Sequence, residues 1–160
     1  DHMLVCDYKN GTWGTPEIVP FQPISLMPSA KIFHYGQSIF EGMKAYKDAD
    51  KKTWLFRPDE NFKRFNISAK RLSIPELPEA VFMEGLKALL KVDEQWIPTQ
   101  DGSSLYIRPI IFAALLALVI GAVQITHHLG YCDQITGVDL LLIFLCSAGP
   151  HSPFHLGFSA

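Results

Sequence analysis

Charge is divided very unevenly along this chain, and the division limits how it can fold. All 14 lysine and arginine residues lie at or before Arg108. The residues that follow contain only two acids, Asp133 and Asp139. The segment from residue 109 onward is therefore mostly apolar, and its surface has to be covered by the rest of the protein or by a partner. We therefore expect one domain over residues 1–112 and a separate continuation over residues 113–160.

The overall composition excludes several classes of protein. A chain of 160 residues suits one domain, and its net charge of -2 includes no basic block typical of nucleic-acid binding. The three cysteines are far apart and odd in number, which argues against a disulfide framework. No basic region followed by an apolar run begins the chain, so we expect no secretory signal. The sequence favours the cytoplasm, or the mitochondrion if a transit segment precedes Asp1.

Turn residues divide the first third of the chain into short strands. Asn10 and Gly11 are typical of a two-residue hairpin turn. Four prolines between residues 15 and 29 argue against continuous regular structure there. A polar run at residues 48–52 predicts a turn between two further strands. The predicted strands cover residues 4–8, 32–35, 42–46 and 53–56, and Trp13 begins the return strand of the hairpin.

Two amphipathic helices are predicted next. Pro58 suits the first turn of a helix, and the following two acids suit its positive end. Arg64 falls on a different face from the apolar residues of this helix. A second helix is predicted over residues 80–92, and a strand over residues 103–111. The sequence therefore predicts an α+β fold, an antiparallel sheet with helices flanking one side. The apolar face of the first helix comprises Phe62, Phe65, Ala69 and Leu72.

Two long apolar runs lie in the uncharged part of the chain. The first covers residues 110–123, which is short for a membrane span of about twenty residues. We expect a buried strand–helix element there, and a buried strand over residues 138–146. The alternative is a membrane-associated chimera in which the first run inserts. That alternative has no flanking lysine or arginine on its C-terminal side to set an orientation.

The stretch from His34 to Tyr46 is rich in aromatic residues and contains two glycines, Gly36 and Gly42. Aromatic and β-branched residues suit a half-buried pleated surface, and glycine permits a kink or the close approach of another group. Read alone, the stretch is better explained as two core strands joined by a bulge than as the wall of a ligand pocket.

Further motifs accompany this stretch: Asp1-His2-Met3-Leu4, Trp13-Gly14, Trp54-Leu55-Phe56-Arg57-Pro58, Asn61-Phe62-Lys63-Arg64-Phe65, Ser68-Ala69-Lys70-Arg71-Leu72 and Ser104-Leu105-Tyr106-Ile107-Arg108-Pro109. In this order they resemble the branched-chain amino-acid aminotransferases, which are fold-type-IV pyridoxal-phosphate enzymes. The resemblance covers about residues 1–112. Beyond it, residues 141–149 loosely resemble the next family strand, and Ala114-Leu115-Leu116 replaces a polar pair that is usual in the family. Residues 113–160 are therefore interpreted as the interdomain linker and a divergent or incomplete start of the second domain.

The resemblance assigns roles to individual residues. It implies that Arg64 holds the cofactor phosphate, whereas the helical pattern alone suits a solvated surface arginine. It places Tyr35, Phe40 and Tyr106 along an apolar substrate pocket, where core packing is the alternative. Arg108, on the same strand face as Tyr106, would support a substrate carboxylate, and otherwise is an edge-strand charge. For Glu41 and Lys44, supporting polar contacts and surface positions are equally good interpretations.

The resemblance also implies an activity for the complete protein. Pyridoxal phosphate would carry an amino group from leucine, isoleucine or valine to 2-oxoglutarate in a homodimer, with part of the dimer interface in this domain. The family's cofactor-binding lysine and the acid paired with the cofactor ring lie in the second domain. No lysine follows Lys91 here, so we assign no catalytic residue and expect the chain alone to be inactive.

Two alternatives remain open besides the membrane-associated chimera. One is a non-catalytic binding or dimerisation module derived from this domain. Another is a sister activity of the same fold type, D-amino-acid transamination or aminodeoxychorismate lysis. A metal site is disfavoured: His151 and His155 have helical spacing, but Pro153 between them spoils a helix, and no closely spaced cysteine pair supports a site. We therefore predict no metal. The other candidate ligands are His127, His128 and Cys132.

Overall fold

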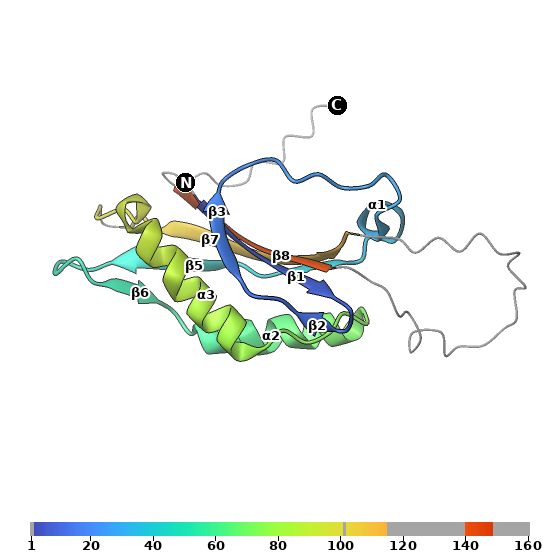
Figure 1. Cartoon of the computed structure of the whole chain (residues 1–160). Helices are drawn as coiled ribbons and strands as arrows, with labels where there is room; N and C mark the ends of the chain where they lie inside the picture. The colour runs from blue at the N-terminus through green and yellow to red at the C-terminus, as the bar shows by residue number, and fades with distance from the viewer. Residues whose placement is uncertain (1, 101, 115–139, 149–160) are drawn as a thin grey trace, which may run out of the picture.

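The computed structural model describes residues 2–100, 102–114 and 140–148. These residues form one eight-stranded sheet in which the paired strands are antiparallel (Figure 1). The main order is β2-β1-β8-β7-β5-β6; β3 also pairs with β1, and β4 with β7. The strands are β1 His2–Lys9, β2 Thr12–Trp13, β3 Glu17–Pro20, β4 Ser38–Phe40, β5 Met43–Lys47, β6 Thr53–Leu55, β7 Leu105–Ala113 and β8 Leu140–Ala148.

Two long helices cover one face of this sheet, as Figure 1 shows. Helix α2 spans Pro58–Arg71 and helix α3 spans Glu79–Val92. Pro58 occupies the first turn of α2, and the acids Asp59 and Glu60 lie at its positive end, as the sequence predicted. The described residues also form a five-residue helix α1, Lys31–Tyr35, and a 3₁₀ turn η1, Glu94–Trp96. The α+β fold predicted from the sequence is confirmed.

An aromatic cluster joins both helices to the sheet. The fully buried ring of Phe82, on α3, lies 5.4 Å from the ring of Phe62 and 5.9 Å from that of Phe65, measured between centroids. Both of these rings come from α2. On its other side, Phe82 meets Phe144 of β8 edge-on at 5.2 Å. Burying rings of this size supplies a large part of the hydrophobic stabilisation. The position of α2 over the sheet therefore depends on Phe82.

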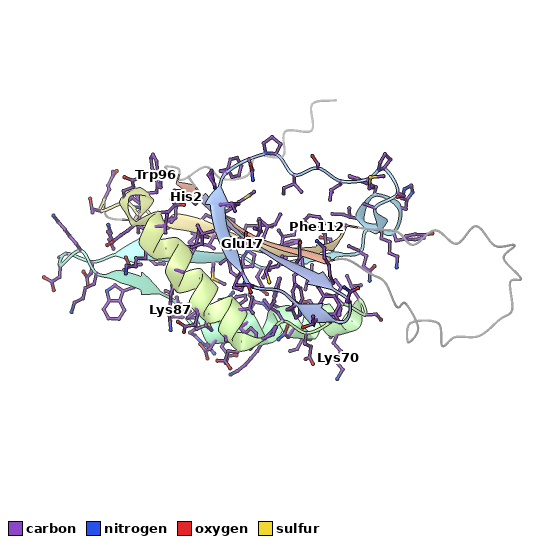
Figure 2. All side chains as sticks on the ribbon, viewed as in Figure 1. His2, Glu17, Lys70, Lys87, Trp96 and Phe112 are labelled. Atoms are coloured by element: carbon purple, nitrogen blue, oxygen red, sulfur yellow. The ribbon has the colours of Figure 1, made fainter. Side chains whose placement is uncertain are left out.

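A second, smaller core lies on the opposite face of the sheet. Met3, Phe112 and Ile143 form it, and Phe112 is labelled in Figure 2. Phe144, next along the chain, belongs to the helix-facing cluster. Neighbouring residues of a strand point to opposite faces, so β8 contributes to both cores. Ile32 of α1 and Leu26 also pack against the second core, and both are partly buried.

Strand β8 comes from the apolar part of the chain and lies inside the sheet, between β1 and β7. It pairs along its whole length with β7, from Leu140 opposite Ala113 to Ala148 opposite Leu105. The strand predicted at residues 138–146 is thus confirmed from residue 140 onward, with Leu142, Ile143 and Phe144 buried, and residues 138 and 139 lie outside the described residues. The boundary predicted near residue 112 stays a prediction, although the first domain's sheet includes a strand from beyond it. Of the other apolar run, residues 115–123 lie outside the described residues.

One prediction about the first third of the chain is wrong. Residues 32–35 were expected to form a strand, but they lie in α1. That helix ends at Gly36, whose φ of 61° is the left-handed conformation that glycine adopts readily. Continuous regular structure was not expected between residues 15 and 29, and the four-residue strand β3 is the only helix or strand there. Because β3 pairs with β1 alone among the described strands, its proline does not interrupt a central ladder.

The turns agree with the sequence prediction. Asn10 and Gly11 have φ angles of 53° and 82°, as a hairpin turn of this length requires. The polar turn at residues 48–52 joins β5 to β6. On α2, Phe65 and Ala69 are buried as expected, but Leu72 is the C-cap residue and is 42% exposed.

Among the described residues, no helix has the length and apolar character needed to cross a membrane. The same residues hold no group of three or more histidine, cysteine, aspartate or glutamate side chains arranged for a metal ion. The histidines weighed as metal ligands, His127, His128, His151 and His155, lie outside the described residues, as does Cys132.

We predict that Phe82→Ala lowers the free energy of unfolding by about 3–5 kcal/mol, because it leaves a cavity among three other rings. Urea unfolding followed by circular dichroism measures this loss. Val92→Ala, at the exposed end of the same helix, is the matched control and is expected to change stability by less than about 0.5 kcal/mol. Equal effects of the two substitutions would contradict the role given to Phe82.

Candidate functional site

The candidate site lies where the corner between β4 and β5 meets helix α2 and strand β7. Glu41 and Gly42 form this corner. The backbone N–H of Glu41 donates to the carbonyl oxygen of Pro109 in β7 at 2.9 Å. Gly42 is in close contact with Tyr106, because a Cβ atom built on it would lie 2.7 Å from the tyrosine hydroxyl oxygen. A side chain at this position would therefore have to displace the tyrosine hydroxyl.

Arg64 and Glu41 form a bidentate ion pair at this corner. The arginine Nε donates to Oε1 of Glu41 at 2.5 Å, and Nη2 donates to Oε2 at 2.6 Å. Asn61, one turn earlier on α2, donates from Nδ2 to the same Oε2 at 2.9 Å. Glu41 is only 6% exposed, whereas the Arg64 side chain is 63% exposed. A buried carboxylate thus holds a guanidinium group at the surface of the molecule.

The surroundings of Glu41 favour its charged form. Burial by itself raises the pKa of this carboxyl, but the hydrogen bonds from Arg64 and Asn61 and the charge of Arg64 outweigh that effect. The pKa of Glu41 is therefore lower than the usual value for glutamate. The same hydrogen bond and charge raise the pKa of Arg64. Both partners are ionised at neutral pH.

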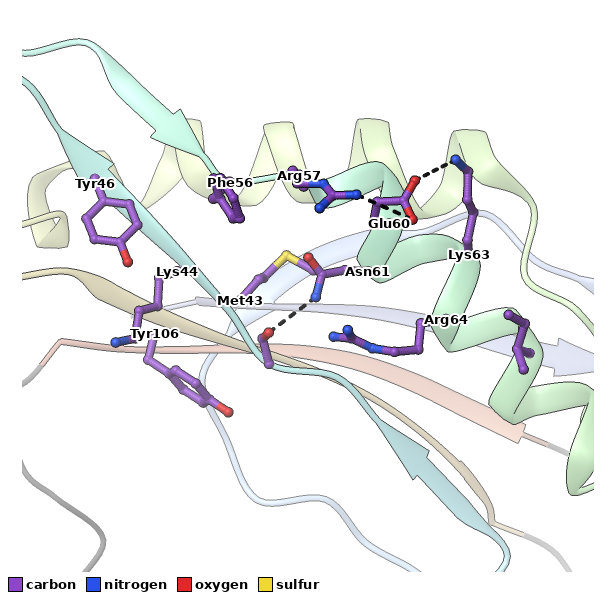
Figure 3. A pocket seen from close by; sticks show the side chains of 12 residues that line it. Met43, Lys44, Tyr46, Phe56, Arg57, Glu60, Asn61, Lys63, Arg64 and Tyr106 are labelled. Atoms are coloured by element: carbon purple, nitrogen blue, oxygen red, sulfur yellow. Dashed lines mark hydrogen bonds and ion pairs between the residues drawn. The ribbon is translucent and has the colours of Figure 1, made fainter.

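Beside this ion pair lies an open groove of about 860 Å³. Figure 3 shows the Arg64 side chain reaching into it from α2, with Lys44 and Tyr106 on the opposite side. Among the described residues, four cationic side chains line the groove, and only one acid does. That acid, Glu60, accepts from Lys63 at 2.7 Å and lies 3.9 Å from Arg57. The cationic residues are Lys44, Arg57, Lys63 and Arg64.

Arg108 stands between two aromatic rings on the face of the sheet that α2 and α3 leave uncovered. Its guanidinium carbon lies 4.5 Å from the centroid of the Phe40 ring and 5.1 Å from that of Tyr106. Such cation–π contacts restrain a guanidinium group without using its N–H donors. Phe40 is 62% exposed, so it is a surface ring rather than a core residue.

The structure brings together most of the site residues predicted from the sequence. Phe40, Tyr106 and Arg108 form one cluster, and Tyr106 also lines the groove that contains Arg64. Tyr35 is apart from them. It is the last residue of α1, it is 72% exposed, and its ring has a tilted contact with that of His34.

Three contributions to the site were not predicted, or were predicted only in general terms. Asn61 was quoted within a motif but given no role, and it proves to be the second donor to Glu41. Glu41 was expected only to make supporting polar contacts. Arg57 was also quoted without a role, and it lines the groove with a left-handed φ of 48°. That conformation is uncommon outside glycine. The sequence signal that could have drawn attention to Arg57 is its place directly before Pro58, at the start of a helix.

The arrangement is suited to binding an anion that carries several oxygen atoms. A guanidinium group presents five N–H donors in a plane, and Glu41 uses two of those of Arg64. The remaining donors and three further cations border an open groove. Phosphate and carboxylate are the oxyanions whose geometry a guanidinium group matches.

The fold is that of known branched-chain aminotransferases. The crystal structure of the Escherichia coli branched-chain amino acid aminotransferase superposes with a TM-score of 0.61 at 23% identity, over 93% of this chain and 40% of that chain. A T.th. branched-chain amino acid aminotransferase, complexed with N-(5'-phosphopyridoxyl)-L-glutamate, gives a TM-score of 0.54 at 26% identity. That match covers 90% of this chain and 40% of the other. These likenesses show that the chain has the fold of one part of such enzymes.

The sequence comparison identifies the family. Branched-chain-amino-acid aminotransferase 2 of Bacillus subtilis is 50% identical to this chain over 114 residues, which is 71% of the chain. Over that part, the chain belongs to the branched-chain-amino-acid aminotransferase family. It spans about a third of the relative's length, since the match covers 31% of that protein. No family model matches the chain.

We predict that the stabilisation due to the Glu41–Arg64 pair depends on pH in one direction. Because the pKa of Glu41 is lower in the folded chain, the folded form binds its proton less tightly than the unfolded form does. The contribution is therefore complete above the unfolded glutamate pKa of about 4.3, and it is lost as the pH falls through the folded value. The difference in unfolding free energy between the wild type and Glu41→Gln should shrink accordingly.

Urea unfolding at pH 7 and at a series of lower pH values measures this difference. Asp59→Asn, which removes an acid from the exposed start of the same helix, is the matched control and should cost little at any pH. A difference for Glu41→Gln that stays constant across the series would contradict the prediction.

Proposed function

We propose that the protein containing this chain transfers an amino group between a branched-chain amino acid and 2-oxoglutarate, with pyridoxal phosphate as cofactor. The observation that carries the proposal is the Arg64 guanidinium group, held by Glu41 at a cationic groove. The chain is also 50% identical over 114 residues to a branched-chain-amino-acid aminotransferase. The chain would supply one wall of the active site, and the rest of the protein would supply the reactive lysine.

The groove fits the cofactor that the family implies. Arg64 would bind the phosphate through the N–H groups that Glu41 leaves free, and the other cations of the groove would add positive potential. When bound, pyridoxal phosphate supplies an electron sink and a carrier for the amino group. The role of this chain is to hold the phosphate end and to form part of a pocket that limits access of water.

We assign the substrate to the neighbouring cluster of Phe40, Tyr106 and Arg108. Two aromatic rings form an apolar surface suited to a branched aliphatic side chain. Arg108 lies against both rings, which restrains its guanidinium group and leaves its N–H donors available to a carboxylate. Tyr35 is assigned to the same pocket by resemblance alone.

The exposed rings support the proposal that this face is covered in the complete protein. Tyr35 and Phe40 are 72% and 62% exposed, although aromatic side chains of this size are usually at least half buried. A second domain and a partner subunit of a homodimer would cover them. We propose that the boundary between the two domains lies near residue 112 and that the dimer acts in the cytoplasm.

The assignment of Arg64 is tested by Arg64→Ala. We predict that the substitution weakens binding of pyridoxal phosphate by about tenfold or more, since it removes charge-assisted hydrogen bonds to the phosphate. Binding of pyridoxal, which lacks the phosphate, should not change. Titration of the purified chain with each compound, followed by nuclear magnetic resonance (NMR), measures both affinities.

Arg71→Ala provides the matched control, because Arg71 is an exposed arginine in the last turn of the same helix, outside the groove. Its loss should leave both affinities unchanged. Equal weakening by Arg64→Ala and Arg71→Ala, or no weakening by either, would contradict the phosphate role of Arg64.

The chain by itself is predicted to catalyse no transamination, because no lysine follows Lys91 and none before it matches the family's reactive lysine. Incubation with leucine, 2-oxoglutarate and pyridoxal phosphate should produce no glutamate above the rate without protein. Gel filtration should also remove the added cofactor. Leucine-dependent turnover would contradict the assignment of the reactive group to another part of the protein.

A further inference from the structure

We propose that Glu41 is a positioning residue, which sets the orientation of the Arg64 guanidinium group for phosphate binding. This inference rests on the proposed function, because it concerns the same anion. It also explains why a negatively charged residue, Glu41, lies beside a site proposed for a negatively charged phosphate, an arrangement that charge repulsion alone would disfavour.

The two hydrogen bonds between Glu41 and Arg64 fix the orientation of the guanidinium plane as well as its distance from the carboxylate. Glu41 accepts from both Nε and Nη2 of Arg64, at 2.5 and 2.6 Å, so the carboxylate lies along one side of the guanidinium group. Rotation about the last bonds of the arginine would break both hydrogen bonds. Three of the five N–H donors remain free, all at the end of the group away from Glu41. These donors are the ones available to a ligand in the groove.

Arg64 has little else to hold it. Its side chain is 63% exposed, and in the described part of the chain Glu41 is its only hydrogen-bonding or ion-pair partner. A long exposed side chain without a partner samples many rotamers, and fixing it costs free energy when a ligand binds. Glu41 removes that cost before the ligand arrives.

Glu41, in contrast, is held from three sides. It is 6% exposed, and its backbone N–H donates to the carbonyl oxygen of Pro109 in β7. Asn61 donates to its Oε2 at 2.9 Å and also to the carbonyl oxygen of Gly42 at 3.3 Å. The backbone of Glu41 is therefore attached to β7, and its carboxylate is held from α2 by Asn61, which also bonds the β4–β5 corner. Glu41 thereby restrains the exposed Arg64 side chain relative to the sheet.

Orientation and net charge predict opposite effects of removing this carboxylate. Glu41→Gln removes one negative charge beside the groove, so affinity for an anion would rise if electrostatic potential alone determined it. If Glu41 acts by orienting Arg64, affinity falls, since a neutral amide offers one acceptor where the carboxylate offers two. Glu41→Asp retains the charge but shortens the side chain by one methylene, so only the orienting role predicts a loss.

The experiment is an NMR titration of the whole 160-residue chain with inorganic phosphate and with pyridoxal phosphate, at low salt. We expect both Glu41→Gln and Glu41→Asp to weaken binding by about tenfold, the size expected for loss of one charge-assisted hydrogen bond. Asp59→Asn makes the same charge change as Glu41→Gln on the neighbouring helix α2, outside the groove, and it should leave affinity unchanged or slightly higher.

A second measurement reports on Arg64 directly. The Nε–H proton of an arginine held by a carboxylate exchanges slowly with water, and its NMR signal is retained. We expect this signal of Arg64 in the wild type and in Asp59→Asn, and its loss in Glu41→Gln. In the Arg64→Ala background, Glu41→Gln should not weaken phosphate binding further, because there is no guanidinium group left to orient.

The outcomes separate this inference from the proposed function. If Arg64→Ala abolishes phosphate binding but Glu41→Gln strengthens it, the positioning role is wrong and the phosphate role of Arg64 stands. If Glu41→Gln weakens binding equally with and without Arg64, the effect is structural and the positioning role is again wrong. If the wild-type chain shows no saturable phosphate binding, the phosphate role of Arg64 fails and the positioning role fails with it.

Discussion

The packing of Phe82 against three other aromatic rings determines where the functional residues can lie. Its contacts with Phe62 and Phe65 hold α2 over the sheet, and its contact with Phe144 ties α3 to β8. Once the apolar stripe of α2 is buried, the helical period directs Arg64 away from that stripe toward the β4–β5 corner. The position of the arginine is thus a consequence of core packing by its neighbours on the same helix.

The parts of the fold that the sequence predicted well are those where a long periodic pattern coincides with clear end signals. Helix α2 combines an apolar stripe with a proline and two acids in its first turn, and the hairpin after β1 contains Asn10-Gly11. Residues 32–35 carry the aromatic and β-branched composition of a strand but form one helical turn. Four residues are too few for a period to be distinguished, and the contact of Ile32 with the second core is tertiary, which no local pattern predicts.

The site was predictable only in part, for a similar reason. Arg64, Phe40, Tyr106 and Arg108 were singled out from motifs, and the structure places the last three in one cluster. The pairing of Arg64 with Glu41 joins residues separated by 23 positions, and it depends on a corner whose geometry no local pattern specifies. The close approach of Gly42 to Tyr106 is also a tertiary contact. The glycine directly after Glu41 was the sequence signal for a tight corner at this point.

Strand β8 has a consequence for how the chain folds. It separates β1, at the start of the chain, from β7, which begins about a hundred residues later, and it hydrogen-bonds to both. The central ladder of the sheet is therefore the last to be completed, because its middle strand is made after both neighbours. During synthesis, β1 and β7 each have an unpaired edge until residues 140–148 leave the ribosome, and exposed edges of this kind favour association between chains. Loop closure over such sequence distances also slows folding, so this domain is expected to fold slowly and late.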